Sequence, residues 1–178
     1  EWGMKRWKVY LDSPMATKVV DVYRRHMHLF DHEGRTQWGN GDDPFTLTGL
    51  RFVDSMEESR ELNRHANGCI LIAGSGMCNG GRVRHHLKHN LWRHGAHVMI
   101  VGYQAQGTLG RQLVDGYSTV RIFNEIIRVN ARIHTVGGLS AHVDQSGLLN
   151  WYAHFRNKPP VYLVHGEDKA REILAKEL

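Results

Sequence analysis

The sequence is poor in cysteine and lacks any long apolar run. Its 178 residues contain two cysteines, Cys69 in an apolar segment and Cys78 among glycines. Two cysteines provide no framework of paired disulfides and suit a reducing compartment. No apolar run approaches the roughly 20 residues that a membrane-spanning helix needs, and no signal peptide precedes the first predicted strand. These absences predict a soluble, cytoplasmic protein with no membrane partner.

A large excess of one charge is also lacking. Lys and Arg exceed Asp and Glu by 23 to 18, and there are 13 histidines, which add positive charge as the pH falls toward their usual pKa of about 6.5. This balance favours a polyanionic partner, but only modestly. Hydrophobic residues make up 41% of the chain, enough for a real core, so a disordered chain is not expected.

What the sequence contains is an alternation of short apolar strands and amphipathic helices. This pattern is typical of an α/β fold with a mostly parallel sheet covered by helices. Strands are predicted at Val9–Leu11, in LRFVDS, at Cys69–Ala73 as a buried strand, and in HVMIVGYQ. Helices are predicted at Met15–Phe30, Glu57–His65, Arg82–Trp92 and Thr108–Val114. The polar stretch DHEGRTQWGNGDDPF is predicted to be a surface loop.

The pattern changes after Asp115. VRIFNEIIRVNARIHTV contains strand-like runs that suit a hairpin. A helix in QSGLLNWYAHF, a strand in PVYLVHGE and a helix in KAREILAKEL follow. We therefore divide the chain into residues 9–125 and 126–178. Because the chain reaches its first strand within ten residues without an initiator Met, we expect it to be a piece of a longer protein.

The stretch CILIAGSGMCNGGRVRHHLKH, residues 69–89, runs from an apolar strand through glycines into a basic helix. Such a junction presents unpaired backbone N–H groups at a helix N-terminus, where the helix dipole favours anions. An arginine at its exit can hold a phosphate by fork-like hydrogen bonds. The predicted phosphate-binding residues are Ser75, Gly76, Gly80, Gly81 and Arg82.

Two well-known phosphate-binding patterns are incomplete here. The dinucleotide fingerprint needs an acidic residue about 20 residues further on, but the next predicted strand ends in GYQ. The Walker-type loop fails because no Lys-Ser or Lys-Thr follows the glycines. A cradle for one phosphate remains, beside a structural alternative in which the glycines only let the helix pack on the sheet.

A second glycine stop, in GYQAQGTLGRQL, follows the neighbouring strand and begins another helix at Gly107 and Thr108. Loops at the carboxyl ends of adjacent parallel strands open on the same side of the sheet. We therefore expect two phosphate cradles to face one crevice. An extended polymer with phosphates along it would use both, whereas a small ligand rarely would.

Histidines are the candidates for chemistry. GGLSAHVDQ places His142 in a glycine-led turn, with Asp144 as a predicted helix cap. VYLVHGE places His165 at the end of a predicted buried strand, immediately before Gly166. Both positions suit a metal ligand or an acid–base group, and a purely structural histidine is the alternative for each.

A further cluster of histidines lies on one predicted helix. His85 and His89 have the i,i+4 spacing of a metal pair, and His86 lies between them. No third ligand is visible beside them. A basic, solvated helix face explains this cluster better than a metal site.

Six motifs, in this order, resemble one known family. They are VYLDSPMA, PF before LRFVDS, ILIAGSGMCNGGRVRHHLKH, VMIVGYQAQGTLGRQL, GGLSAHVDQ and VYLVHGE. The chain resembles the RNA-processing metallo-β-lactamase proteins with a β-CASP insertion, the group that contains the cleavage and polyadenylation nuclease. The resemblance extends from about Val9 to Leu178. It implies a β-CASP domain over 9–125, followed by the carboxyl-terminal strands and helices of the αββα metallo-β-lactamase fold.

The resemblance implies a ribonuclease with two zinc ions, in which a metal-bound hydroxide attacks an RNA phosphodiester. The family's proton-transferring histidine falls on His142, and a zinc-binding histidine falls on His165. Ser140 and the loop Gly74–Arg82 fall where the family holds RNA phosphates. The implied partners are RNA, expected to be single-stranded, and a second copy of the intact protein in a homodimer.

One family motif is lacking. No H-x-H-x-D-H string, which carries most of the family's zinc ligands, occurs in the sequence. A catalytic zinc needs about three protein ligands, so we expect this chain to hold few or no tightly bound zinc ions and to be inactive without the amino-terminal lactamase half. Two alternatives stay open: a non-catalytic RNA-binding module of a degenerate family member, and a nucleotide-cofactor enzyme on the same kind of sheet.

Overall fold

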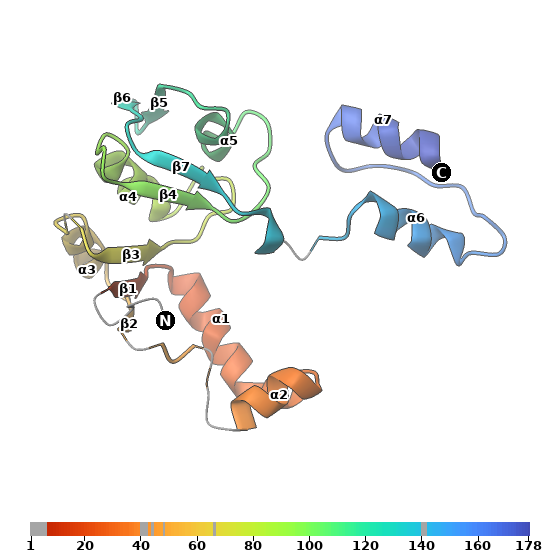
Figure 1. Cartoon of the computed structure of the whole chain (residues 1–178), viewed down its shortest axis with the longest axis horizontal. Helices are drawn as coiled ribbons and strands as arrows, with labels where there is room; N and C mark the ends of the chain where they lie inside the picture. The colour runs from red at the N-terminus through yellow and green to blue at the C-terminus, as the bar shows by residue number, and fades with distance from the viewer. Residues whose placement is uncertain (1–6, 40–42, 44, 48, 66, 140–141) are drawn as a thin grey trace. The chain divides into compact units, whose positions relative to one another are not determined.

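A computed structural model describes residues 7–39, 43, 45–47, 49–65, 67–139 and 142–178. The chain divides into two compact units, Glu1–Leu139 and Ser140–Leu178. The strands of the first unit are β1 (Lys8–Leu11), β2 (Leu50–Phe52), β3 (Cys69–Ile72), β4 (His97–Ile100), β5 (Thr119–Ile122), β6 (Glu125–Arg128) and β7 (Arg132–Thr135) (Figure 1). Its α-helices are α1 (Pro14–Arg25), α2 (His32–Gly39), α3 (Met56–Leu62), α4 (Val83–Asn90) and α5 (Leu109–Val114), with 3₁₀ turns at Met27–Leu29 and Gly137–Leu139.

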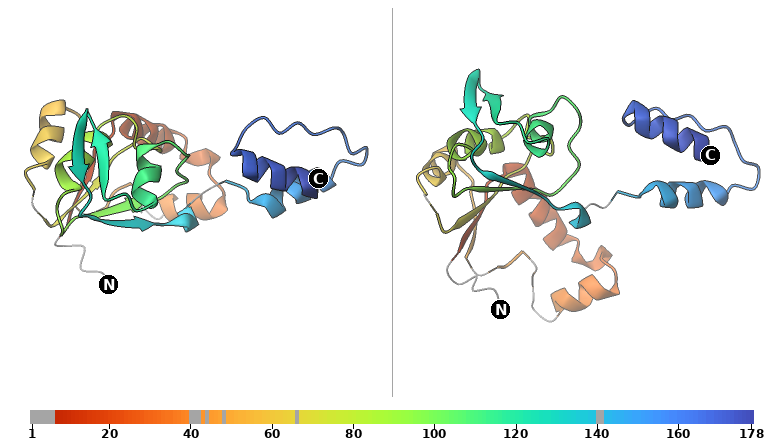
Figure 2. Two further views of the ribbon diagram at one scale, coloured as in Figure 1. Left: turned by 90° about the horizontal axis from the view of Figure 1, so that it is seen from above. Right: turned by 45° about the horizontal axis from the view of Figure 1, so that its top comes forward.

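Parallel pairing dominates the strands of the first unit. β1 lies between β2 and β3 and runs parallel to both, with Val9 opposite Leu50 on one side and Ile70 on the other. β4 pairs in parallel with β7, with Val98 opposite Ile133. β5 and β6 form an antiparallel hairpin, which stands out from the parallel strands in Figure 2. The predictions of a mostly parallel α/β sheet and of a hairpin after Asp115 are confirmed.

Two apolar clusters hold the first unit together. The smaller one joins Tyr10 of β1, Val53, which follows β2, and Leu62 of α3. The larger cluster lies beside β4 and β5, where α4 and α5 contribute the fully buried Leu91 and Leu113. These clusters fix the carboxyl ends of β1, β3 and β4, which are the positions of the predicted loops.

The predicted surface loop after Phe30 contains a helix, α2, so that prediction was wrong in part. The backbone N–H of Gly34 donates to Asp31 Oδ1 at 2.8 Å, and an aspartate in this position caps a helix start. The helix predicted to reach Phe30 ends instead at Arg25 and continues as a tighter 3₁₀ turn.

The second unit contains α6 (Gln145–Ala153) and α7 (Asp168–Glu177). None of its described residues, 142–178, is buried. The predicted strand in PVYLVHGE is absent: Val161–Val164 has no strand assignment, and Tyr162 and Val164 are 83% and 87% exposed. A strand needs a neighbouring strand for its N–H and C=O groups, and no described residue supplies one here.

Within the described ranges, the structure contains no helix with the length and apolar character needed to cross a membrane.

Candidate functional site

The first glycine loop follows β3 and has an unusual backbone. Ser75 and Cys78, which are not glycines, adopt positive φ values of 137° and 57°. Gly81 has φ +65°, and a Cβ atom there would lie 3.0 Å from the Gly74 carbonyl oxygen. The Ser75 hydroxyl accepts a hydrogen bond from the Gly80 N–H at 3.3 Å. Positive φ at ordinary residues costs about 1–3 kcal/mol each and is concentrated at functional sites.

The second glycine loop, between β4 and α5, interlocks with the first. The Gln104 amide donates to the Gly76 carbonyl at 2.7 Å. The Leu109 N–H donates to Asn79 Oδ1 at 2.9 Å, and the Gly110 N–H donates to the Met77 carbonyl at 3.1 Å. The prediction that the two loops lie together is therefore confirmed.

Gln104 is the bridge between these loops, and it was not among the residues predicted from the sequence. Its side chain is buried, and its Oε1 lies 1.6 Å from the place where a Cβ atom on residue 110 would stand. Only glycine leaves room at position 110. The signal that could have indicated this contact is a glutamine directly after a predicted strand, a few residues before a glycine in the next helix.

The predicted phosphate-binding residues of the two loops have different surroundings. Open space surrounds Gly76, Gly80 and Gly107, where a Cβ atom would meet no atom within 4 Å. The Thr108 hydroxyl instead donates to the Ala105 carbonyl at 2.6 Å and accepts from the Arg111 N–H at 3.2 Å, and so caps α5. The backbone of Gly76 and Gly107 is thus accessible to a ligand, whereas the Gly80 N–H and the Thr108 hydroxyl are used within the protein.

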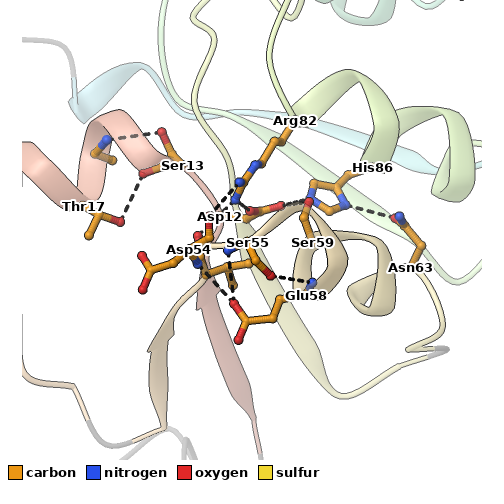
Figure 3. A network of polar contacts seen from close by, with 12 residues as sticks. Asp12, Ser13, Thr17, Asp54, Ser55, Glu58, Ser59, Asn63, Arg82 and His86 are labelled. Atoms are coloured by element: carbon orange, nitrogen blue, oxygen red, sulfur yellow. Dashed lines mark hydrogen bonds and ion pairs between the residues drawn. The ribbon is translucent and has the colours of Figure 1, made fainter.

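Beneath the first loop lies a buried carboxylate, Asp12, at the end of β1 (Figure 3). It accepts hydrogen bonds from the Ser59 hydroxyl at 2.6 Å and from Arg82 Nη1 at 2.5 Å. His86 Nε2 lies 2.5 Å from Asp12 Oδ2, the oxygen that also accepts from Ser59, and His86 Nδ1 lies 3.0 Å from Asn63 Oδ1. This Asp12 network joins β1, α3 and α4.

Arg82 completes the network from the exit of the first loop. Its Nη1 also donates to the Val53 carbonyl, and its Nη2 donates to the Asp54 carbonyl, each at 3.0 Å. Its side chain is only 17% exposed. The guanidinium therefore fixes the end of the glycine loop to β1 and to the residues that follow β2. Its predicted contact with a phosphate stays a prediction.

The electrostatics of this network keep Asp12 charged. Burial raises the pKa of the Asp12 carboxyl, but the hydrogen bonds from Ser59, His86 and Arg82 together outweigh burial and hold that pKa below its ordinary value. In contrast, burial raises the pKa of the Cys78 thiol. Cys78 is therefore a buried thiol within the loop and is not a reactive thiolate.

His86 corrects the prediction of a solvated helix face. His86 is buried in the Asp12 network, while His85 and His89 are exposed on the same helix. Asp12 and Ser59 were also missed as site residues. The signal that could have found them is an aspartate directly after an apolar strand, because a charged side chain at a buried strand end needs partners.

The sequence-predicted catalytic residues lie in the second unit. His142 is exposed and precedes Asp144, whose side chain accepts from the Gly147 N–H at 2.8 Å and caps α6 as predicted. His165 is exposed and lies outside any strand, and Ser140 lies outside the described residues. The roles of these residues stay predictions.

A zinc site needs several ligating side chains close together. They contain no group of three or more His, Cys, Asp or Glu side chains that could hold a metal ion. A catalytic zinc takes about three protein ligands. The described surroundings of His165 therefore do not complete a zinc site.

A cavity of about 220 Å³ opens beside the two loops. It is lined by Asn79, Arg84, Gly107, Leu109, Gln112 and Arg121. The cavity therefore adds two arginines to the predicted cradle region, and neither was a candidate from the sequence.

Two family models match the chain. One describes the Beta-Casp domain and matches residues 1–113. The other describes a Zn-dependent metallo-hydrolase RNA specificity domain and matches residues 126–178. The contact division at Leu139 and Ser140 differs from both limits, and the domain boundary at residue 125 stays a prediction.

Curated relatives show the same resemblance over nearly the whole chain. Ribonuclease TTHA0252 of Thermus thermophilus is 41% identical over 175 residues, which cover 98% of this chain and 40% of that protein. Transcription termination factor FttA of Methanocaldococcus jannaschii is 30% identical over 173 residues, covering 93% of this chain and 27% of that protein. The chain thus spans less than half of the length of these relatives.

Proposed function

Because the chain belongs to the β-CASP family of RNA-processing metallo-β-lactamase proteins, we propose that it is the RNA-binding part of a zinc-dependent ribonuclease. The reaction is hydrolysis of RNA phosphodiester bonds in the cytoplasm, and the substrate is single-stranded RNA. The names of the relatives, a ribonuclease and transcription termination factors, support this proposal.

The observation that carries the proposal is the pair of interlocked glycine loops. Their open backbone at Gly76 and Gly107 can approach phosphate oxygens closely, because no side chain stands between these residues and the ligand. Gln104 fixes the loops to each other. Two phosphates of one RNA strand would bind to a rigid surface, so little ordering would be needed on binding.

The second unit contributes the chemistry in this proposal. His142 transfers a proton at the scissile phosphate, and Ser140 contacts a phosphate oxygen. His165 is one ligand of a zinc site whose other ligands would come from residues outside this chain. Zinc would stabilise negative charge on the phosphate. We expect the chain alone to be inactive, since its described residues contain no complete ligand set.

A binding experiment with matched glycines tests the cradles. Gly76→Val places a side chain in open space that we assign to RNA, whereas Gly95→Val places one in open space away from the loops. We expect Gly76→Val to weaken the binding of fluorescent single-stranded RNA about tenfold, as expected for the loss of one charge-assisted hydrogen bond. Gly95→Val should bind like the wild type. Equal affinity of the two variants in fluorescence anisotropy would contradict the cradle.

The roles of the two histidines are tested in a longer protein that contains this chain and the missing ligands. His165→Ala should lower both zinc content and RNA cleavage. His142→Ala should retain zinc and cleave about 10²- to 10⁴-fold more slowly, with a much smaller change in RNA affinity. Zinc stoichiometry and single-turnover cleavage of both variants decide the assignment. Loss of zinc in His142→Ala alone would reverse the roles.

A second candidate function is a non-catalytic RNA-binding module. The observation that favours it is the lack of a three-ligand metal group among the residues that the structure describes. The same longer protein separates the two functions: RNA binding without zinc or cleavage would establish the module. Titration with a nicotinamide dinucleotide, for which we expect no binding, tests the cofactor-enzyme alternative.

A further inference from the structure

We propose that Arg84 and Arg121 form a phosphate-binding subsite beside the glycine loops, and that it holds a backbone phosphate of the RNA. This inference rests on the proposed function. It extends the glycine cradles, with which the cavity shares Gly107, because both arginines lie outside the two loops, on α4 and β5.

The walls of the cavity come from five separate segments. Asn79 belongs to the first glycine loop and Gly107 to the second, while Gln112 lies on α5. Arg84 and Arg121 supply the positive charge, and no carboxylate is among the residues that line the cavity. The cavity therefore borders both glycine loops, and it is placed to receive a further phosphate of an RNA strand that binds to them.

The two arginines differ from the neighbouring basic residues in their partners. Arg82 pairs with Asp12, Lys88 with Glu125 and Arg111 with Asp115. Within the described part of the chain, neither Arg84 nor Arg121 takes part in an ion pair. Their charges are thus available to an anion from solvent.

Arg84 is also held in place before any ligand binds. Its guanidinium carbon lies 4.3 Å from the centroid of the Phe123 ring. Phe123 and the next residue, Asn124, have positive φ values of 49° and 64° at the turn of the β5–β6 hairpin, as a two-residue type I′ turn requires. The cation–π contact restricts Arg84, so less side-chain freedom is lost on binding.

Polar groups of the cavity complement the charges. The Asn79 Oδ1 accepts from the Leu109 N–H, which leaves the amino group of Asn79 as a donor, and Gln112 provides a second amide. Guanidinium groups bind phosphate oxygens through paired N–H donors. The cavity combines two guanidinium groups with amide donors, and its described lining contains no carboxylate. This set of groups favours a phosphate, whether it belongs to an RNA backbone or to a small phosphate ester.

The experiment uses the 178-residue chain and compares two arginines that line the cavity with one that does not. Arg84→Gln and Arg121→Gln each remove one charge from the cavity. Arg128→Gln is the matched control, because Arg128 is exposed on the same hairpin and does not line the cavity. We expect each cavity variant to weaken binding of single-stranded RNA about tenfold and to reduce the salt slope of log affinity by about 0.7, the value for one phosphate contact on a single strand. The control should change affinity less than about twofold, as expected for a distant, screened charge.

Titration of the same proteins with inorganic phosphate, followed by NMR, separates the sources of the phosphate. Binding of RNA that is equal in Arg121→Gln and Arg128→Gln would overturn the subsite. Phosphate binding that Arg121→Gln abolishes, with RNA affinity unchanged, would overturn it in favour of a site for small phosphate esters. If the wild type binds no RNA, the proposed function fails, and the RNA subsite fails with it. Circular dichroism of each variant confirms the fold, and the exposed Arg121 gives the decisive variant if Arg84→Gln is unstable.

Discussion

The two units of the chain differ in what lies beneath their surfaces. The first unit has two apolar clusters and a buried polar network around Asp12. In the second unit, no described residue is buried, and Tyr162 and Val164 are almost fully exposed. Both segments have the sequence pattern of an α/β fold. The comparison shows that an apolar strand pattern predicts a need for burial, while burial itself depends on the presence of a partner.

Hydrogen exchange gives the largest expected difference between the units. Helices of 9 and 10 residues are marginal in water without tertiary packing. We expect the amides of α6 and α7 to exchange nearly as fast as unstructured chain, and those of α4 and β4 to exchange about 10³-fold or more slowly. Mass spectrometry of the whole chain measures both. Strong protection in α6 and α7 would show that the second unit has packing partners in this chain.

Asp12→Asn should have the next largest effect, on the free energy of unfolding. The substitution leaves Arg82 and His86 without the carboxylate that they contact, which costs about 3–5 kcal/mol for a buried pair. Asp54→Asn, at an exposed neighbouring aspartate, is the control and should stay within about 0.5 kcal/mol. Urea unfolding of both variants measures the difference.

The pH dependence of the same experiment has a defined sign. The folded pKa of Asp12 is lowered, so its contribution is present above the unfolded pKa of about 3.9 and is lost as the pH falls through the folded pKa. Wild-type stability should therefore fall more steeply below about pH 4 than that of Asp12→Asn. Parallel curves in this range would show that other carboxyls control the acid response.

Leucine truncations compare the cores directly. Leu113 is 1% exposed in the larger cluster of the first unit, and Leu148 is 38% exposed on α6. Leu113→Ala should reduce the free energy of unfolding by about 2–5 kcal/mol through lost burial and a cavity. Leu148→Ala should change it by less than about 0.5 kcal/mol. A large effect at Leu148 would contradict the difference between the units.

Helix caps give the smallest effect. Thr108→Ala removes the cap of α5, which packs into the larger cluster, and should cost about 1 kcal/mol of global stability. Asp144→Ala removes the cap of α6 and should reduce helicity locally without shifting the main unfolding midpoint. Circular dichroism during urea unfolding follows both changes. A shift of the midpoint in Asp144→Ala would link α6 to the cooperative unit.

Local patterns predicted several helix and strand features well. Ordinary turn and cap chemistry identified the hairpin after Asp115 and the cap of α6 at Asp144, since these features depend on residues close together in the sequence. The meeting of the two glycine loops was predicted from strands that share one sheet. The loops do meet, but β3 and β4 belong to different sheets, and Gln104 makes the contact between the loops.

Features that depend on distant residues were not predictable in the same way. His86 and Asp12 are 74 residues apart, and periodicity alone placed His86 on a solvated face. Arg121 reaches the cavity only because the β5–β6 hairpin stands beside α5. The prediction of a strand at Val161–Val164 was wrong for the opposite reason: the local strand pattern was present, but no described residue pairs with this segment.

The parallel pairing of β4 with β7 sets a limit on exchanging modules between relatives. β7 lies at residues 132–135, inside the range 126–178 of the second family model, yet it packs in the first unit. A chimera joined at residue 126 would therefore give β4 a foreign neighbour along its whole edge. Recombination between homologous proteins should be tolerated better after residue 139 than at the family limit, because a crossover there keeps both strands of this pair from the same parent.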